Sequence, residues 1–338
     1  MASVIPEPQV ESKTTRRPVI AVVIPCYRVR DQVASLLKRI GPEVSHVYCV
    51  DDACPENSGE VVERIAESDS RIQLIRHQKN KGVGGAVVSG YRRALEDGAE
   101  IFVKIDGDGQ MDPARIEQVA APIQFGEADY VKGNRFFRLE GLHGMPWIRI
   151  VGNAGLSFLT KLSTGYWNLF DPTNGFTAIH ANVVRSLPLE KISSRYFFES
   201  DILFRLNTLR AVIVDVPMDA RYEDDQSSLS VARSLFEFPL RHLRNTFKRL
   251  FYNYYLRNFS IASIHLILGI LLLLFGGIFG VTHWVHNAQI GQVTPSGTVM
   301  LAALPLIFAS QFLLNFIAFD MANIPRHPIH GRLRRENP

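Results

Sequence analysis

Hydrophobic and polar positions divide the N-terminal part of the chain into short apolar runs and longer amphipathic stretches. Between about residues 19 and 216, β-branched runs typical of buried strands alternate with stretches whose apolar residues have helical spacing. The expected strands are residues 19–25, 44–50, 72–77, 101–106 and 128–132. The expected helices between them are residues 31–40, 58–67, 84–97 and 113–125. This order predicts βαβ units, and therefore an α/β, Rossmann-like domain with a mostly parallel sheet.

The pattern changes near the C-terminus, where two long runs contain no Asp, Glu, Lys or Arg. They are residues 261–285 and 299–319. Each is long enough to cross a hydrocarbon core of about 30 Å as a helix. Buried core helices are the alternative, but two adjacent uncharged runs of this length are rare in soluble domains. We expect a hairpin of two transmembrane helices within residues 260–320.

Basic residues flank this hairpin, and they predict its orientation. The link between the runs, residues 286–298, has no Lys or Arg, whereas both outer flanks are basic. By the positive-inside bias, both chain ends lie in the cytoplasm and the link lies outside. The flanking residues are Arg241, Arg244, Lys248, Arg249 and Arg257 before the first run, and Arg326, Arg332, Arg334 and Arg335 after the second.

The remaining segments follow from this division. Residues 1–18 are polar and contain proline, so we expect a disordered tail and no signal peptide. The large domain, residues 19–230, should then stay in the cytoplasm, and residues 321–338 should form a basic cytoplasmic tail. The protein is thus expected to be an integral membrane protein with two spans.

A juxtamembrane segment, residues 231–259, precedes the first span. Its apolar residues recur every three or four positions, and basic residues surround them, which predicts an amphipathic helix lying in the cytoplasmic membrane interface. A linker helix packed on the domain is the alternative. The apolar stripe consists of Phe236, Leu240, Leu243, Phe247, Leu250 and Tyr254.

Composition narrows the function classes. The net charge is only +4, and no basic segment interleaved with aromatic residues is present, so nucleic acid is not an expected partner. Cys26, Cys49 and Cys54 have neither disulfide nor metal-ligand spacing and should be structural. The histidines also lack the spacing of a zinc site.

The most informative motif is Asp106-Gly107-Asp108-Gly109-Gln110, which directly follows the apolar run 101–105. Two carboxylates two residues apart at the end of a strand lie on the same side of the chain, at the sheet edge where α/β folds bind ligands. Hard oxygen donors of this kind suit Mg²⁺ or Mn²⁺ bridging a diphosphate. A simple turn is the alternative, because Asp and Gly are common turn residues.

Other strand ends and one glycine-rich loop carry candidate binding residues. Pro25 and Tyr27 follow the first expected strand, and Asp51 and Asp52 follow the second. A glycine-rich loop begins at Gly82, but it lacks the third glycine of a dinucleotide-binding fingerprint. That loop should either offer its backbone to a phosphate or serve packing.

A series of motifs resembles the family 2 glycosyltransferases with a GT-A fold, and among them the polyprenyl-phosphate glycosyltransferases, which include dolichyl-phosphate mannose synthase and bacterial glucosyl relatives. The resemblance covers roughly residues 19–230. The motifs are, in order, VVIPCYRVRD, CVDDACPENSG, NKGVGGAVVSGYRRAL, KIDGDGQMDP, VKGNR, DPTNGFTAI and FFESDIL.

The resemblance implies roles on the donor side of the site. Pro25 and Tyr27 correspond to the base-binding turn, and Asp51 with Asp52 to the acidic pair that holds the nucleobase and ribose. One departure concerns this turn, where Arg28 and Val29 replace the usual Asn and Glu, so the donor's base is open. Asp106 and Asp108 match the metal site for Mg²⁺ or Mn²⁺, with Gln110 as an adjoining ligand.

The same resemblance implies roles on the acceptor side. Arg135, with Lys132, falls where relatives contact the acceptor phosphate or the diphosphate. Asp171 matches an acidic residue near the acceptor and is a candidate base or sugar-hydroxyl contact, unless it only caps the turn before Pro172. Glu199 and Asp201 lie in an expected helix, residues 197–209, and Asp201 aligns better with the family's acidic position.

These observations predict an inverting, metal-dependent transfer of one hexose from a UDP- or GDP-linked sugar to a polyprenyl phosphate at the cytoplasmic leaflet. The partners would be the nucleotide sugar, the polyprenyl phosphate and membrane lipid; the oligomeric state, including a homo-oligomer, is open. A processive polysaccharide synthase is one alternative, but no tryptophan here follows an arginine, as its Gln-x-x-Arg-Trp motif requires. A non-catalytic, nucleotide-binding membrane scaffold is the other.

Overall fold

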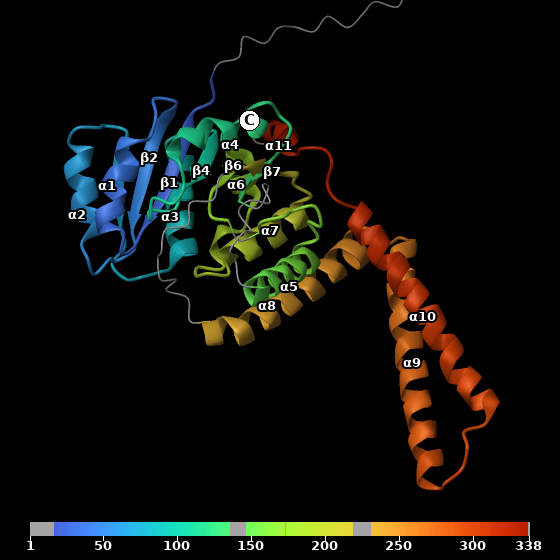
Figure 1. The fold of residues 1–338 in the computed structure, drawn as a ribbon. Coiled ribbons are helices and arrows are strands. Elements are labelled where there is room, and N and C mark those ends of the chain that lie inside the picture. Colours follow the sequence, from blue (N-terminus) through green and yellow to red (C-terminus); the bar gives the residue numbers. More distant parts are fainter. Residues whose placement is uncertain (1–16, 136–146, 173, 219–230, 337–338) are drawn as a thin grey trace, which may run out of the picture.

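The computed structural model describes residues 17–135, 147–172, 174–218 and 231–336. Ser227, Ser228 and Ser230, which resemble a Ser-rich loop that the family has near the donor site, lie outside these ranges. Figure 1 shows an α/β domain from which a long helical hairpin projects.

The domain is built on one seven-stranded sheet with the order β3-β2-β1-β4-β6-β5-β7. Strands β1 to β4 are parallel to one another, β5 is parallel to β7, and β6 runs antiparallel between β4 and β5. The predicted α/β fold with a mostly parallel sheet is therefore confirmed. The strands are β1 (Ile20–Cys26), β2 (Val44–Asp51), β3 (Ile72–Arg76), β4 (Ile101–Lys104), β5 (Tyr130–Asn134), β6 (Thr177–His180) and β7 (Ile213–Pro217).

Alternating side chains of these strands feed two apolar cores, one on each face of the sheet. Helices α1 (Arg30–Lys38), α2 (Ser58–Ala66) and α4 (Ile116–Gln124) cover the face that includes Val22 and Val103. Helices α3 (Val83–Glu96), α6 (Ala181–Ser186) and α7 (Phe198–Leu209) cover the face that includes Val23 and Phe102. The carboxyl ends of β1, β2, β4 and β5 and the start of β6 therefore meet at one edge of the sheet.

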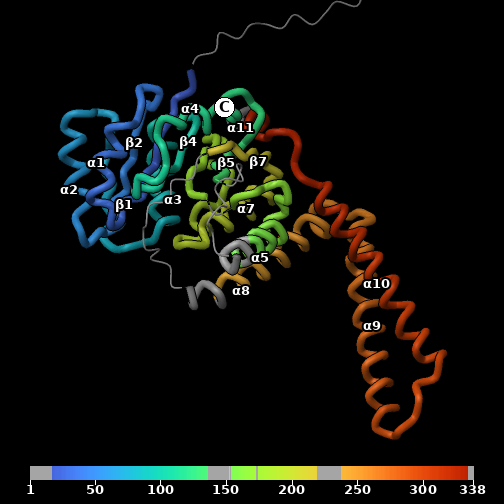
Figure 2. Tube along the Cα trace, in the orientation of Figure 1, coloured from blue at the N-terminus to red at the C-terminus, as the bar shows by residue number. Residues whose placement is uncertain are grey.

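The C-terminal part begins with α8 (Val231–Phe251), which packs against α5 (Trp147–Thr164) under the domain in Figure 1. A π-helical turn, Tyr252–Arg257, connects α8 to the hairpin. The hairpin helices α9 (Ile261–Gln289) and α10 (Ser296–Ala322) lie side by side in Figures 1 and 2 and are long and apolar enough to cross a membrane. Glycines allow close approach, since a Cβ at Gly269 would lie 2.8 Å from Leu313 Cγ.

After the hairpin the chain returns to the domain, which was not predicted from the sequence. Helix α11 (His330–Glu336) packs against α6, near the C label in Figure 1. Asp129 accepts hydrogen bonds from the backbone N–H groups of Ile329 and His330 and pairs with His330 Nδ1 at 2.8 Å. Burial acts against ionisation of Asp129, but these donors outweigh it and lower its pKa.

Candidate active site

Asp106 and Asp108 lie in the turn that follows β4, at the sheet edge described above. Asp108 Oδ1 accepts a hydrogen bond from the Gln110 backbone N–H at 3.1 Å. Gly109 has a φ of +78°, a conformation that glycine adopts without strain. The turn thus presents both carboxylates beyond the end of the strand, as expected for a ligand site of an α/β sheet.

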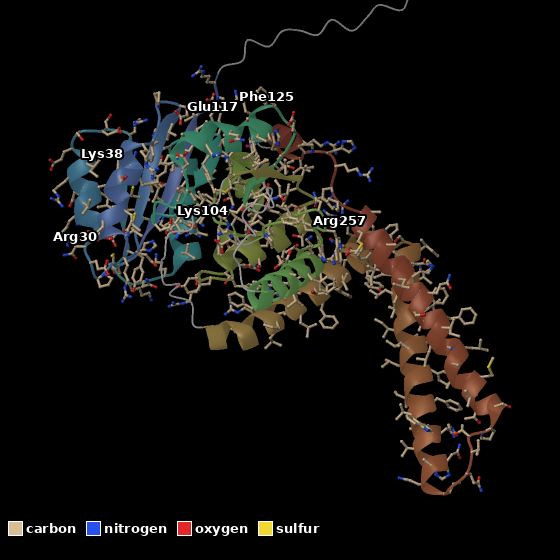
Figure 3. The ribbon with its side chains drawn as sticks, viewed as in Figure 1. Arg30, Lys38, Lys104, Glu117, Phe125 and Arg257 are labelled. Carbon is tan, nitrogen blue, oxygen red and sulfur yellow. The ribbon has the colours of Figure 1, made fainter. Side chains whose placement is uncertain are left out.

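Lys104, which is labelled in Figure 3, is the last residue of β4. Its side chain is buried and contacts Asp106. Its Nζ atom donates to Asp106 Oδ1 at 2.8 Å and to Glu199 Oε1 on α7 at 3.2 Å. Burial opposes the charge on Lys104, but the two carboxylates outweigh it and raise the pKa. Gly175 packs against this pair, because a Cβ there would overlap Asp106 Oδ2. The ammonium holds Asp106 in place while the Asp106 side chain stays 31% exposed.

A second buried lysine, Lys132, lies on the same face of the sheet. Thr177 of β6 is directly opposite both Lys104 of β4 and Lys132 of β5, and residues opposite one another in antiparallel strands point to the same face. Lys132 Nζ donates to the Asn174 carbonyl. Burial lowers the pKa of Lys132 to about 8, although carboxylates such as Glu199 act against this shift.

Arg135 and Asp171 form an ion pair just beyond β5. Arg135 Nε donates to Asp171 Oδ2 at 2.8 Å and Arg135 Nη2 donates to Asp171 Oδ1 at 3.2 Å, a two-point geometry. Asn174 Nδ2 also approaches Asp171 Oδ2 at 3.4 Å. Asp171 is fully buried, whereas Arg135 remains partly exposed. These contacts suit a carboxylate that orients Arg135 better than they suit a proton acceptor.

The candidate donor-side residues lie at the ends of the neighbouring strands β1 and β2. Pro25 is partly buried near the end of β1, whereas the Tyr27 side chain is exposed, with the Arg28 guanidinium 5.5 Å from its ring centroid. Asp51 ends β2, and its Oδ1 accepts a hydrogen bond from the Cys54 backbone N–H at 2.8 Å. The structure therefore brings Tyr27 and Asp51 to the same edge as the Asp106 turn.

Asp52 is buried, and its carboxylate holds the glycine-rich loop. It accepts hydrogen bonds from the backbone N–H groups of Lys81 at 2.8 Å and Gly82 at 2.7 Å, and pairs with His77 Nδ1 at 2.6 Å. Gly82 has a φ of +83°, and a Cβ there would lie 2.5 Å from the Ser194 carbonyl oxygen. These contacts favour the packing alternative for Gly82 and a structural role for Asp52 rather than a direct nucleotide contact.

The two carboxylates of α7, Glu199 and Asp201, have different surroundings. Asp201 Oδ2 accepts from the Ser193 backbone N–H at 2.9 Å and from Arg205 Nε at 3.0 Å, and Asp201 Oδ1 faces Asn245 of α8. Asp201 thus ties α7 to its neighbours. Glu199 is the α7 carboxylate that contacts the sheet edge, through Lys104. Sequence reasoning missed Lys104, although a charge in the otherwise apolar run of β4 marks it.

The Asp106 turn fits a divalent cation by the chemistry of its donors. Two carboxylates and the Gln110 amide offer only hard oxygen ligands. Among the described residues, no group of three or more His, Cys, Asp or Glu side chains could hold a metal. The chain would therefore supply a small part of the coordination shell and leave the rest to a diphosphate and water, an arrangement usual for Mg²⁺.

Helix α8 has its polar face inside and its apolar face outside. His242, Asn245 and Arg249 are buried against the domain. The opposite face exposes four large apolar side chains with Arg244 and Lys248 between them. Those side chains are Leu240, Leu243, Phe247 and Phe251, and Phe158 of α5 is also exposed. This arrangement suits a helix that rests on lipid, with cations that reach the headgroups.

The predicted apolar stripe is only partly correct. Leu240, Leu243 and Phe247 are exposed as predicted, but Leu250 is partly buried and Tyr254 is buried. The Phe236 side chain lies outside the described residues. Helix α8 therefore packs on the domain, as the linker-helix alternative expects, and also presents an apolar face. Its position in the membrane interface stays a prediction.

Comparisons with known proteins agree with this geometry. Residues 21–187 match the model of glycosyl transferase family 2. The UDP-N-acetylglucosamine–dolichyl-phosphate N-acetylglucosaminyltransferase of Methanococcus voltae is 29% identical over 219 residues, which cover 61% of this chain and 87% of that protein. The undecaprenyl-phosphate mannosyltransferase of Micrococcus luteus is 31% identical over 205 residues, which cover 59% of this chain and 82% of that protein.

A solved structure supports the fold alone. Glucosyl-3-phosphoglycerate synthase from Mycobacterium tuberculosis, in complex with Mn²⁺, UDP-glucose and phosphoglyceric acid, superposes with a TM-score of 0.52 at 18% identity. The match covers 69% of this chain and 79% of that one. The α/β domain thus has the GT-A fold, as predicted. The sequence matches show that the chain belongs to glycosyl transferase family 2.

Proposed function

We propose that this protein transfers one hexose from a UDP- or GDP-linked sugar to a polyprenyl phosphate, with inversion at the anomeric carbon, at the cytoplasmic leaflet of a membrane. One observation carries the proposal. The acidic Asp106 turn and the cationic groups Lys132 and Arg135 meet at one sheet edge of a domain whose helix α8 presents an apolar face. The polyprenyl-phosphate activity of the relatives supports the choice of acceptor.

The donor would bind across the ends of β1, β2 and β4. Tyr27 offers an exposed ring for the base, and Asp51 ends the neighbouring strand where a ribose would lie. Asp106, Asp108 and Gln110 would hold Mg²⁺ or Mn²⁺ against the diphosphate. When bound, such a cation neutralises charge on the leaving diphosphate. Lys104 holds the Asp106 carboxylate in the orientation needed for that contact.

The acceptor would bind near Arg135 and Lys132. A phosphate monoester has a second pKa of roughly 6, so it is largely ionised at neutral pH and needs no strong general base. The protein's task is then to orient the phosphate and to balance its charge. Asp171 would serve this task by fixing the Arg135 guanidinium in a two-point ion pair. We therefore assign Asp171 to orientation and not to proton abstraction.

The membrane brings the acceptor to this edge. The exposed apolar face of α8 and the basic residues Arg244 and Lys248 would hold the domain at headgroup height, with α9 and α10 spanning the bilayer. The basic flanks support a cytoplasmic position for the domain and for both chain ends. A short hairpin anchor also fits a transferase that adds one sugar better than a processive synthase.

The experiment uses purified full-length protein in lipid vesicles that contain undecaprenyl phosphate. Radiolabelled UDP-glucose, UDP-N-acetylglucosamine and GDP-mannose are supplied separately with Mg²⁺ or Mn²⁺. The proposal predicts label that is extracted into organic solvent with one of these donors and is lost with EDTA. Label that enters only a water-soluble polymer would favour a synthase. Donor binding with no transfer to any lipid would favour the scaffold.

A further inference from the structure

A carboxylate at the domain-proximal end of α10 is buried in a network that reaches the catalytic domain. Asp320 Oδ1 accepts hydrogen bonds from Arg249 Nη1 and from the Tyr254 hydroxyl, both at 2.6 Å. Asp320 Oδ2 accepts from Arg249 Nη2 at 2.9 Å and from Trp167 Nε1 at 2.8 Å. Asp320 is only 4% exposed. Its contacts therefore join the second hairpin helix to α8, to the π-helical turn and to the segment after α5.

Arg249 extends this network into the same segment. Its Nη2 atom also donates to the Leu162 carbonyl at 2.8 Å, near the end of α5. Gly165, which has a φ of +75°, packs so closely on the guanidinium that a Cβ would lie 2.7 Å from Arg249 Nη1. The prediction that Arg249 is one more cation of the membrane flank is thus wrong, because the side chain is buried in the junction.

The segment held in this way, residues 165–171, ends at the acceptor side of the site. Trp167 contacts Asp320, and four residues further along the chain Asp171 holds Arg135. Between them, the Phe170 backbone N–H donates to Asp215 Oδ2 at 2.9 Å. Asp215 lies on β7 opposite Lys132. A contact made by the membrane hairpin is therefore four residues from the carboxylate that orients the candidate phosphate-binding arginine.

Stability alone does not explain this network. A carboxylate next to an apolar span is costly to bury, and apolar residues of similar size often replace a buried ion pair without loss of stability. Compared with apolar packing, a hydrogen-bonded ion pair adds geometric specificity, because each carboxylate oxygen needs its donor at a defined distance and angle. The Trp167 N–H is the donor that belongs to the acceptor-side segment.

We infer that Asp320 is a positioning residue for the acceptor site. By accepting the Trp167 hydrogen bond, Asp320 fixes the backbone conformation of residues 165–171. This segment ends at Asp171, which in turn fixes the orientation of Arg135. The hairpin is then part of the active-site scaffold and not only an anchor. This inference rests on the proposed function for the identity of the acceptor, but the linkage between α10 and residues 165–171 can be measured without it.

The first test is Trp167→Phe in the full-length protein, with Trp284→Phe as the matched control. The change removes the N–H that Asp320 accepts together with part of the indole ring, and Trp284→Phe makes the same chemical change at a residue that is 70% exposed near the distal end of α9. Loss of one charge-assisted hydrogen bond should lower kcat/KM for geranyl phosphate, a short acceptor that needs no membrane, about 5- to 20-fold. The dissociation constant of the active nucleotide sugar should stay within about twofold, because the donor contacts lie elsewhere. The control should match wild type in both.

The second test is the double variant Arg249→Met/Asp320→Leu, which removes the ion pair without leaving a lone buried charge. Its thermal midpoint should stay near the wild-type value, its defect toward geranyl phosphate should equal or exceed that of Trp167→Phe, and hydrogen exchange of residues 165–171 should become faster. Wild-type acceptor kinetics and wild-type exchange in both variants would overturn the inference. If the wild-type protein transfers sugar to no isoprenyl phosphate, the proposed function fails, and the exchange of residues 165–171 still decides the linkage.

Discussion

Two buried ionic networks in this molecule differ in how far the protein pairs their charges. At the sheet edge, Lys104 joins Asp106 and Glu199, yet the Asp106 side chain remains 31% exposed. At the junction with the hairpin, Arg249 and Asp320 are both almost fully buried, and the carboxylate accepts four hydrogen bonds. The first network keeps one side open at the ligand edge of the sheet, whereas the second is closed.

The difference separates two uses of the same chemistry. A closed pair fixes parts of the protein relative to one another, and its free energy depends on both partners being present. In an open pair, the carboxylate is partly exposed and can also contact a bound cation. A buried ion pair therefore does not by itself indicate a binding site. An ion-pair network in which one carboxylate is partly exposed at the edge of a sheet does.

The largest effect should come from breaking the closed network on one side. Arg249→Met leaves Asp320 buried without its cation, which costs about 3–5 kcal/mol in the free energy of unfolding. Thermal unfolding in detergent should show a clearly lower midpoint. Asp320→Leu added to Arg249→Met should recover most of this loss. A single variant that melts like wild type would show that the stability of this network does not depend on the Arg249–Asp320 pair.

Substitution of a carboxylate at the sheet edge should lower the transfer activity and leave the stability unchanged. Asp108→Asn should reduce transfer by about 3–4 kcal/mol, or two to three orders of magnitude, because a charge facing the diphosphate is lost. Asp112→Asn is the matched control, since Asp112 only caps the short helix that follows and Asn caps equally well. Both variants should keep the wild-type thermal midpoint. Equal activity in the two variants, or full wild-type activity in EDTA, would contradict the metal role.

Arg135→Ala tests the acceptor side of the same edge. Removal of a charge-assisted contact to the lipid phosphate should cost about 1.5–3 kcal/mol in kcat/KM for the acceptor. Donor affinity, measured by calorimetry with a nucleotide diphosphate and metal, should change little. Arg205→Ala is a useful comparison because that arginine pairs with Asp201, away from the edge. A collapse of donor affinity with normal acceptor kinetics would move Arg135 to the donor side.

The smallest effect concerns pH, and it separates the two lysines of the sheet edge. Burial lowers the pKa of Lys132 to about 8, while the pKa of Lys104 is raised. Lys132 should therefore lose its proton as the pH rises through about 8, and transfer should decline there. For stability the sign is opposite, because an unfolded lysine titrates near 10.4 and the native state gains stability between these values. In the Lys132→Arg variant, residue 132 should stay charged at alkaline pH, and the decline of transfer above about pH 8 should disappear. If the variant has the same pH profile as wild type, deprotonation of Lys132 is not the cause of the decline.

Local patterns predicted much of the fold. Strands β1 to β5 are β-branched runs bounded by turn residues, and the hairpin follows from two uncharged runs, so each left a signal within a short window. Strands β6 and β7 were missed. β6 has only four residues and runs antiparallel between β4 and β5, so its place depends on distant partners. The return of α11 to Asp129 also joins residues far apart in the chain.

Some features of the candidate site could likewise be predicted from the sequence, whereas others depend on contacts between distant residues. Asp106 and Asp108 were predicted to lie at the ligand edge because strand ends gather there. Arg135 and Asp171 were predicted to lie near the acceptor only from the resemblance to the family. The roles of Asp52 and Asp201 depend on which donors surround them in three dimensions, and nothing in the nearby sequence distinguishes them from Asp51 and Glu199. Arg249 resembles the other basic residues before the first span, and only its contact with a residue 71 positions away shows that it is buried.

We propose above all that this protein adds a single sugar to a polyprenyl phosphate. Mass spectrometry of the lipid extracted after reaction with excess nucleotide sugar tests it most directly. The account predicts that undecaprenyl phosphate gains the mass of one hexose unit, that the reaction stops there, and that Asp108→Asn yields almost none of this product. A ladder of several added sugars, or an unmodified lipid with every donor despite a correctly folded protein, would contradict it.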